Sequence, residues 1–443
     1  MLRGDALYST VYDNKEPLFL YLVALQRALG VGAELLAEIG LIIICSSAAY
    51  VIARSIGTAR SALIVGFAAV PIIVTGDFYY PGLTHLPGTA ATLALMALML
   101  RNRFFFAGTL LPVVLFLKIP AFPIAGAAAV IWIWFRARFW DAVCFGAAAV
   151  AAGLLVIGLM ALRGELIPFL YVTKGNISYS DGGLITGAGA LGRAAAHIHL
   201  VGLKGIYIEI TAITLCLALA YTHLSNNATE RKSRLVLIGI CVATMLSGVA
   251  VLALTGFWRH HTQILYISAI LSVISMARFF DNLMRRSFVP AVVASLCLAF
   301  ILAGIPSSRG YLSDLANFFS RYARLQGLSP EAARLLSVST SGTYARLGRN
   351  DEMGHAVGLH HWTLACPRFH QYPFESEAIL NETFECASRS PTLLIGANLG
   401  TAEGGAYNWP AWKHYVSRIE ELLSTHYTCD ASSGLRVCVR RAP

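Results

Sequence analysis

The sequence predicts a polytopic α-helical membrane protein of about ten spans, with a small external C-terminal domain of the α/β or α+β class. Three observations support this prediction. Of the 443 residues, 56% are hydrophobic and only 13% are charged, whereas a soluble domain has about 25% charged residues. Several apolar runs approach the length of about 20 residues that crosses a bilayer. The arginines lie mostly in short connections between these runs, as the positive-inside rule describes for cytoplasmic loops.

The net charge of +10 does not indicate a nucleic-acid partner. The sequence contains no basic helix with interleaved aromatic residues, so we exclude nucleic-acid binding. The first fifteen residues are polar and do not show the pattern of a charged segment followed by an apolar one, so we expect no cleavable signal peptide.

The chain opens with a polar segment, residues 4–19, that carries charges and tyrosines ahead of an apolar run. Pro17 suits the first turn of a helix, because its missing N–H would have no partner there. The run Pro17–Leu29 is too short to span a bilayer, so we expect it to lie along or partly in the interface. A cation and carboxylates at this surface could bind a phosphate or position an acceptor hydroxyl. The alternative is a solvated juxtamembrane collar. The candidate side chains are Asp5, Tyr8, Asp13 and Lys15.

The hydropathy pattern divides the chain into three parts. Residues 1–33 form an external juxtamembrane loop, residues 34–305 a transmembrane domain with a long external loop at 164–205, and residues 306–443 an external soluble domain. The spans are expected at 34–53, 61–76, 83–100, 104–118, 120–135, 141–162, 206–223, 235–256, 263–280 and 288–305.

The loops set the orientation. Alternate connections are rich in arginine and lysine, as at Arg101 and Arg103, while the connections between them are poor in both. We therefore expect the protein to lie in the cytoplasmic (inner) membrane, with every second loop facing the cytoplasm. This places the N-terminal segment, the loop 164–205, the turn 257–262 and the tail outside.

Four of the nine cysteines lie in the polar tail, an even number that suits disulfides in an oxidising compartment. The most economical pairing joins Cys366 with Cys386 and Cys429 with Cys438. A metal site is the alternative, but no CxxC or HxxxH spacing supports it.

The rest of the tail has the pattern of a small mixed domain. Helical spacing occurs over 311–325, and Ser329 begins a second helix. We expect a buried strand at 393–395, an amphipathic helix at 409–423 and a hairpin over 426–440, which Cys429 and Cys438 could join.

Polar residues at the outer ends of spans are candidate site residues. Asp77 is an acid at a membrane boundary, which suits a metal, an acceptor or a proton; the alternative is an interfacial acid beside an aromatic belt. His85 could line the same cavity or be structural. Lys118 could snorkel to the outer interface, or face a cavity and bind an anion.

The turn Phe257-Trp258-Arg259-His260-His261 is the densest polar cluster at an outer edge. Arg259 could bind a phosphate with both arms of its guanidinium, and His260 and His261 could add hydrogen bonds or charge. Adjacent histidines point apart on a helix and are poor ligands for one metal. Anion binding is therefore favoured over a metal.

The opening residues, Gly4-Asp5-x-Leu7-Tyr8-x-x-Val11-Tyr12-Asp13-x-Lys15-x-Pro17-Leu18-Phe19, resemble the first external loop of the GT-C glycosyltransferases. The most similar branch contains the protein O-mannosyltransferases and the lipid A aminoarabinose transferases. The resemblance implies a polyprenyl-phosphate sugar donor and inverting transfer on the outer side of the membrane. It also implies that Lys15 contacts the donor phosphate, with Arg259, His260 and His261 as further donor contacts.

In that family the first span ends in an acidic pair whose aspartate activates the acceptor. The present sequence begins after that point. The resemblance therefore implies either a start farther upstream or a chain without that base, and Asp77 resembles a second external acid that assists in some members.

These observations together lead us to expect a membrane glycosyltransferase that moves a hexosyl or pentosyl group to a hydroxyl of a lipid, glycan or protein acceptor. A divalent cation is compatible with this chemistry, but no ligand cluster in the sequence requires one. The alternatives are a non-catalytic lipid-linked-glycan binding or assembly protein, and a transporter or flippase. A transporter would be favoured by inverted repeats and mid-span charges, which the sequence lacks.

Overall fold

The computed structural model describes residues 16–74, 85–181, 215, 228–254, 265–277, 280–281, 342–347, 363–366, 377–395, 399, 410–432 and 435–441. The chain forms two compact units. The helical unit comprises the described residues within 15–158 and 184–318, and the C-terminal unit comprises those within 159–183 and 319–443.

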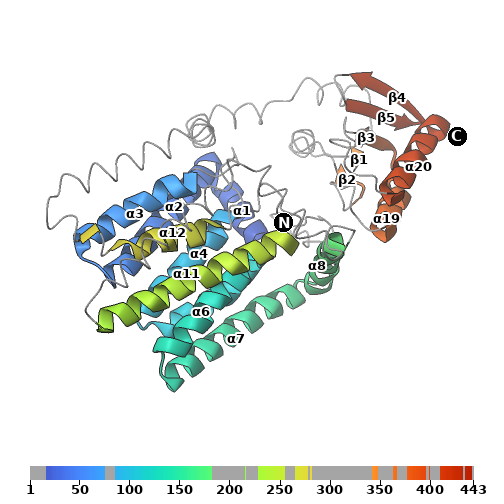
Figure 1. Ribbon diagram of the computed structural model, residues 1–443. Coiled ribbons are helices and arrows are strands. Elements are labelled where there is room, and N and C mark those ends of the chain that lie inside the picture. The colour runs from blue at the N-terminus through green and yellow to red at the C-terminus, as the bar shows by residue number, and fades with distance from the viewer. Residues whose placement is uncertain are drawn as a thin grey trace. The chain divides into compact units, whose positions relative to one another are not determined.

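The helical unit is a bundle of apolar helices joined mostly by short turns (Figure 1). Helix α2 packs on α3 and α4, α4 packs on α5, and α11 packs on α6 and α12. Its elements are α1 (Pro17–Leu29), α2 (Val31–Arg54), α3 (Ala59–Val74), α4 (His85–Leu100), α5 (Phe104–Leu117), the 3-10 turn η1 (Ile119–Ala121), α6 (Phe122–Arg136), α7 (Phe139–Leu162, whose last turn belongs to the other unit), α11 (Ala228–Leu254) and α12 (Tyr266–Ser275).

Three helices in the described part of the chain are long and apolar enough to cross a membrane: Gly32–Arg54, Ile119–Arg136 and Phe139–Leu162. The predicted spans at 61–76, 83–100, 104–118, 235–256 and 263–280 coincide with the shorter apolar helices or segments α3, α4, α5, α11 and α12. The spans predicted at 206–223 and 288–305 lie outside the described residues, except for Leu215. The total of ten spans therefore stays a prediction.

The described part of the predicted external loop 164–205 is largely helical. The segment 164–205 begins with a helix, α8 (Leu166–Asp181). The carbonyl of Glu165 accepts a hydrogen bond from the Phe169 N–H at 2.9 Å, which starts this helix. Pro168 lies in its first turn, where a proline costs no hydrogen bond.

Helix α12 forms the centre of the helical unit. Each of its residues is buried, and it packs against α2, α3, α4 and α11. Its serines, Ser268, Ser272 and Ser275, donate hydrogen bonds to carbonyls one turn earlier in the same helix segment. Such small hydroxyl residues let helices approach closely while no polar group is left without a partner.

Asp281 caps the start of α3 from far along the chain. Its carboxylate accepts a hydrogen bond from the Thr58 backbone N–H at 2.8 Å and another from the Thr58 hydroxyl. A Cβ added at Gly57 would lie 3.2 Å from Asp281 Oδ2, so a larger residue would crowd this contact. The carboxylate therefore holds the chain after α12 against the α2–α3 turn.

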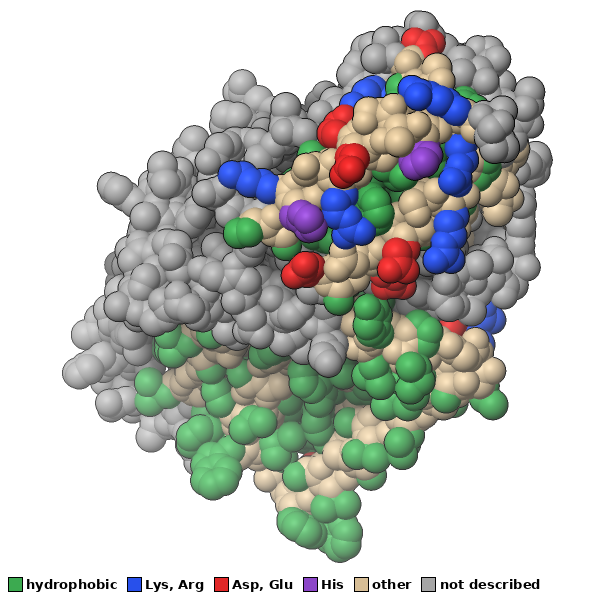
Figure 2. Space-filling model, turned by 90° about the vertical axis from the view of Figure 1, so that its right-hand side faces the viewer, with side chains coloured by type: hydrophobic (Ala, Val, Ile, Leu, Met, Phe, Trp, Pro, Cys, Tyr) green, Lys and Arg blue, Asp and Glu red, His purple; other side chains and the backbone are tan. Residues whose placement is uncertain are grey.

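The surface of the helices differs from that of the C-terminal unit (Figure 2). Hydrophobic side chains dominate the exposed helix surface in this view, whereas charged side chains gather on the C-terminal unit. On α7 the exposed residues include Phe139, Trp140, Leu154 and Leu155. An apolar exposed surface of this kind suits contact with lipid.

The C-terminal unit contains a five-stranded mixed sheet in the order β2-β1-β3-β5-β4. Strand β1 pairs in parallel with β2 and β3, while β5 is antiparallel to both β3 and β4. The core packs buried side chains of the helices, such as Leu380 and Ile419, with β3 residues such as Leu393. The elements besides α8 are β1 (Thr343–Leu347), β2 (Thr363–Leu364), α19 (Glu377–Arg389), β3 (Thr392–Ile395), α20 (Pro410–His426), β4 (Tyr427–Ser432) and β5 (Leu435–Arg440).

The predicted elements of the tail agree with the structure where it is described. The buried strand is β3, the amphipathic helix is α20, and the hairpin is β4–β5. Strands β1 and β2 and helix α19 were not predicted, and the helices expected at 311–325 and from Ser329 lie outside the described residues.

The structure contains both disulfides that the sequence predicts. Cys429 faces Cys438 directly in the β4–β5 register, and their sulfurs are bonded. Cys366, just after β2, is bonded to Cys386 on α19. The alternative of a metal site formed by these four cysteines is therefore wrong.

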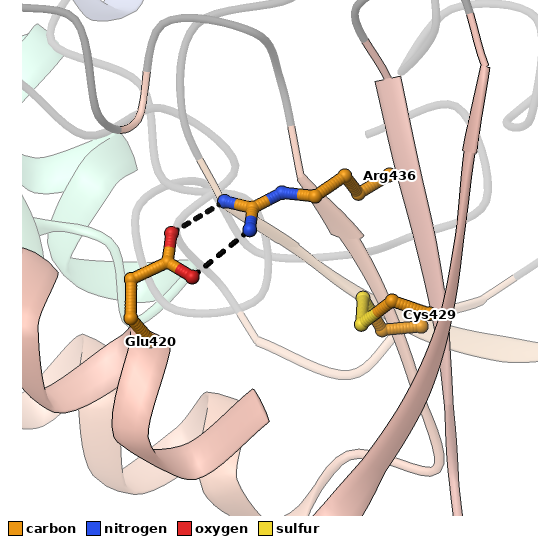
Figure 3. A network of polar contacts seen from close by, with 4 residues as sticks. Glu420, Cys429 and Arg436 are labelled. Carbon is orange, nitrogen blue, oxygen red and sulfur yellow. Dashed lines mark hydrogen bonds and ion pairs between the residues drawn. A yellow bond between two sulfur atoms is a disulfide. The ribbon is translucent and has the colours of Figure 1, made fainter. Parts of the chain in front are cut away.

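A bidentate ion pair also joins α20 to β5 (Figure 3). The Arg436 guanidinium donates to the two carboxylate oxygens of Glu420 at 2.9 and 2.6 Å. These hydrogen bonds lower the pKa of Glu420 below its usual value. Both side chains remain partly exposed, at 45% for Glu420 and 32% for Arg436, so water screens the pair.

We expect that replacing Cys366 and Cys386 together by Ser lowers the stability of the C-terminal unit by about 3 kcal/mol, because the bridge restricts the unfolded chain over a loop of this length. Amide hydrogen exchange of β3 in the full chain measures the effect. Cys144→Ser, at a free exposed cysteine of α7, is the control. Unreduced peptide maps that join Cys366 to any cysteine other than Cys386 would contradict the pairing.

Stability of the C-terminal unit should also depend on pH through Glu420. The folded pKa is lowered from 4.5, so the unfolded chain binds the proton more readily. The stabilisation is then complete above pH 4.5 and is lost as the pH falls through the lower folded pKa. Glu420→Gln should cost about 0.5 kcal/mol at pH 7 and nothing at a pH below the folded pKa, as measured by exchange of β5. Glu421→Gln, which removes a carboxylate of the same helix but leaves the Glu420–Arg436 ion pair in place, is the matched control.

Candidate functional site

The start of α1 meets the turn between α5 and α6 at a buried ion pair. Glu16 Oε1 accepts a hydrogen bond from the Ile119 backbone N–H at 3.0 Å and lies 3.8 Å from Lys118 Nζ. The side chains of Lys118 and Glu16 are only 9% and 7% exposed. The contact joins positions 103 residues apart in the sequence.

Local backbone structure explains why Glu16 lies here. Its carbonyl accepts a hydrogen bond from the Leu20 N–H at 3.1 Å, so Glu16 immediately precedes the first turn of α1, with Pro17 as the first helical residue. This is the position at which proline is favoured. The backbone of Glu16 thus starts one helix, while its carboxylate reaches another.

The turn after α5 supplies the other half of the pair. Lys118 is extended, with φ −160° and ψ 98°, and it ends α5. The N–H of Ile119 then opens η1 and α6, where first-turn donors have no acceptor within the helix. The Glu16 carboxylate satisfies this donor, and a negative charge at a helix start is favourable.

The first turn of α4 lies against the same turn. A Cβ added at Gly88 would lie 2.9 Å from the Lys118 Cβ and 3.3 Å from the Ala121 Cβ. His85 begins α4 three residues earlier and is buried. The structure therefore brings His85, Lys118 and Glu16 to one end of the helical unit.

The surroundings of the pair are apolar. Val114, Ala121 and Ala125 form a small buried cluster beside the α5–α6 turn. An isolated charge would be costly here, so Glu16 and Lys118 neutralise each other. The second carboxylate oxygen of Glu16, Oε2, accepts no hydrogen bond from any residue in the described ranges.

Lys118 departs from one of its two predicted roles. It does not snorkel to the surface of the helical unit, because its side chain is buried beside Glu16. It does meet an anion, but this anion is a carboxylate of the same chain. His85 is buried, which both of its predicted roles allow.

The remaining predicted site residues lie outside the described residues. They are Asp5, Tyr8, Asp13, Lys15, Asp77, Arg259, His260 and His261. Their roles stay predictions. Lys15 is the direct sequence neighbour of Glu16.

The sequence analysis gave no role to four buried acids of the described residues: Glu16, Glu38, Glu165 and Asp281. Glu16 was part of the opening motif but received no role. Glu38 is buried within the candidate span of α2, and Glu165 is buried and bound by Arg163 at 2.9 Å. An acid within or beside an apolar run was the available signal. No group of three or more metal-ligating side chains occurs in the part of the chain that the structure describes.

No protein-family model matches the sequence, and a search of curated proteins gave no match. The fold, however, is similar to structures of an oligosaccharyltransferase from Archaeoglobus fulgidus. One structure holds an acceptor peptide with an NVT sequon, tethered by a disulfide; it has a TM-score of 0.51 and 12% identity over 98% of this chain and 67% of that chain. Another is a complex with an inhibitory peptide and a dolichol-phosphate, with a TM-score of 0.50 and 12% identity over 97% and 66%.

This chain therefore spans about two thirds of the length of the oligosaccharyltransferase. At 12% identity the similarity concerns the fold. The fold of this chain is similar to that of the oligosaccharyltransferase, and this fold and the apolar helices indicate a membrane protein. The resemblance to one branch of the superfamily stays a prediction.

We expect Gly88→Ala to destabilise the helical unit by about 1–3 kcal/mol, because the new methyl group would overlap Lys118 and Ala121. Thermal unfolding in detergent measures this change. Gly126→Ala is a matched control, since a Cβ there meets nothing within 4 Å. It should be neutral, or stabilising by up to about 1 kcal/mol, because alanine favours the helix. Equal effects of the two substitutions would contradict the close approach of α4 to Lys118.

Proposed function

We propose that the protein is a membrane glycosyltransferase that moves a sugar from a polyprenyl-phosphate donor to an acceptor hydroxyl on the outer side of the cytoplasmic membrane. The observation that carries the proposal is the anchoring of the Lys-x-Pro element. Pro17 begins α1, and Glu16 is bound to the α5–α6 turn. Lys15, the proposed donor contact, is therefore covalently joined to a fixed point of a GT-C fold.

The fold similarity supports the same donor class. One structure of the oligosaccharyltransferase of similar fold holds an inhibitory peptide and a dolichol-phosphate, which is a polyprenyl phosphate, and another holds an acceptor peptide. Fold alone does not determine function. The proposal therefore rests on the combination of this fold with the opening motif, and a peptide is one acceptor class to test beside lipids and glycans.

The proposed reaction is a single inverting displacement. The acceptor oxygen attacks the anomeric carbon from the face opposite the phosphate, and the bond between that carbon and the phosphate oxygen breaks. The electron pair leaves with polyprenyl phosphate, and the hydroxyl proton passes to a carboxylate base. The proposed base is an aspartate upstream of the present sequence or, failing that, Asp77.

Cations would stabilise the leaving phosphate. Lys15, Lys118 and Arg259 are the proposed contacts, because charge that develops on the leaving oxygen is best stabilised by preorganised positive groups. Asp5, Tyr8, Asp13, His85, His260 and His261 would orient the sugar and the acceptor through hydrogen bonds.

We expect the purified full chain to transfer radiolabelled sugar from a polyprenyl-phosphate donor to lipid, glycan or peptide acceptors. Lys15→Ala should lower the transfer rate by about 100-fold, because one charge-assisted contact to the leaving phosphate is lost. Lys413→Ala, at an exposed position of α20, is the matched control and should transfer as the wild type does.

Two results would oppose the proposal. Equal transfer by the wild type and Lys15→Ala would show that the donor assignment is wrong. Binding of the donor without any transfer would instead favour a non-catalytic lipid-linked-glycan binding protein.

A further inference from the structure

A capped turn joins the end of α7 to the start of α8. Gly164 has φ +70°, a left-handed conformation that glycine adopts without strain. Its N–H donates to the Ala161 carbonyl at 3.0 Å, and the Glu165 N–H donates to the Met160 carbonyl at 2.8 Å. These two bonds form the Schellman pattern of a helix end. Arg163 Nε donates to the buried Glu165 carboxylate at 2.9 Å, so backbone and side chains together hold the turn.

The length of α7 places this turn at a membrane boundary. The helix has 24 residues and is one of the candidate spans. At 1.5 Å per residue it is about 36 Å long, whereas the hydrocarbon core of a bilayer is about 30 Å thick. A helix of this length that crosses the core ends at its boundary, and α8 begins there.

Helix α8 is too short and too polar to cross back. It has 16 residues, which corresponds to about 24 Å. Its second half, 173–181, is mostly polar, and a span needs about 20 predominantly apolar residues. The helix therefore lies either in the interface or in water.

The exposed face of α8 is apolar. Ile167, Leu170 and Tyr171 are 73%, 52% and 48% exposed, and their spacing of three and four residues places them on one face of the helix. Val172, on another side of the helix, is buried. A helix at the surface of a water-soluble domain has the opposite pattern, with polar residues outward. The last turn of α7 also exposes a leucine, Leu162.

Tyr171 connects this face to the C-terminal unit. Its hydroxyl donates a hydrogen bond to Glu382 of α19 at 3.4 Å, and α8 and α19 both belong to that unit. Tyrosine is enriched at membrane interfaces, because its ring suits an apolar environment while its hydroxyl finds a polar partner. The surroundings of Tyr171 have this combination.

We propose that α8 is the membrane anchor of the C-terminal unit, with Ile167, Leu170 and Tyr171 in the boundary between the headgroups and the acyl chains of the bilayer that α7 crosses. A lipid surface fits this face because it follows directly on the apolar end of a candidate span. Helices of this kind lie in the membrane plane with their apolar face about 5–10 Å deep. The inference concerns the placement of a unit and does not depend on the proposed sugar transfer.

Photolabelling from lipid tests the placement. The full chain is inserted into phosphatidylcholine nanodiscs that contain a lipid with a diazirine either near the glycerol or in the middle of the acyl chain. Irradiation, digestion and mass spectrometry then give the label on each peptide. The face of α8 should take several times more label from the shallow probe than from the deep one. The middle of α7, at Leu154 and Leu155, should show the reverse, and α20 around Lys413 should take no label from either.

Two pairs of substitutions make the test specific. Ile167→Gln combined with Leu170→Gln should lower the shallow label on α8 by about fivefold, because binding to the interface scales with the apolar area buried there. Both side chains are exposed, so the fold should persist, and unchanged amide hydrogen exchange of β3 checks this. Ile167→Leu combined with Leu170→Ile is the matched control. It keeps the apolar area and should be labelled as the wild type is.

Three results would overturn the inference. If α8 takes no label while the middle of α7 does, lipid does not cover this face; cross-links between isotopically distinct copies would then identify a second copy as its partner. If the deep probe labels α8 as strongly as the middle of α7, the helix lies inside the bilayer. If the two glutamines leave the shallow label unchanged, Ile167 and Leu170 do not form the lipid contact.

Discussion

The helical unit depends on hydrogen-bond acceptors for the backbone N–H groups at the starts of its helices. Lipid contains no water that could accept from these donors. Two carboxylates meet this need over long sequence distances. Glu16 accepts the Ile119 N–H from 103 residues away, and Asp281 accepts the Thr58 N–H from 223 residues away. These contacts tie the first helix and the chain after α12 to the turns between central helices. Two buried acids thus link parts of the helical unit that are far apart in the sequence.

Much of the architecture was predictable from local sequence. Apolar runs predicted most of the helices, and the β4–β5 register and the Cys429–Cys438 bond confirm the hairpin predicted over 426–440. Elements that depend on distant partners were missed. Strand β1 is five residues long and gains its stability from β3, which follows it by more than forty residues. Helix α8 was missed because its polar second half resembles a loop.

The candidate site was predictable in part. Lys118 could be identified because a cation between two apolar runs is unusual, but its partner could not, since nothing in the sequence relates Glu16 to a turn 103 residues later. His85 was named as a cavity residue, and the structure shows it buried at the start of α4, beside the turn that holds Lys118. The hydropathy pattern of the sequence identifies a charged residue that is unusual at its position, whereas the fold determines which residues it contacts.

The position of β5 within the sheet has a consequence for biosynthesis. This strand, Leu435–Arg440, is the last of the five in the sequence, yet it lies between β3 and β4. Neither β3 nor β4 can acquire this neighbour until the ribosome has added Arg440. A nascent chain that stalls a few residues earlier exposes two unpaired strand edges, which are aggregation-prone surfaces that chaperones and proteases recognise. Because of this strand order, the sheet can be completed only after β5, its last strand in the sequence, has been synthesised.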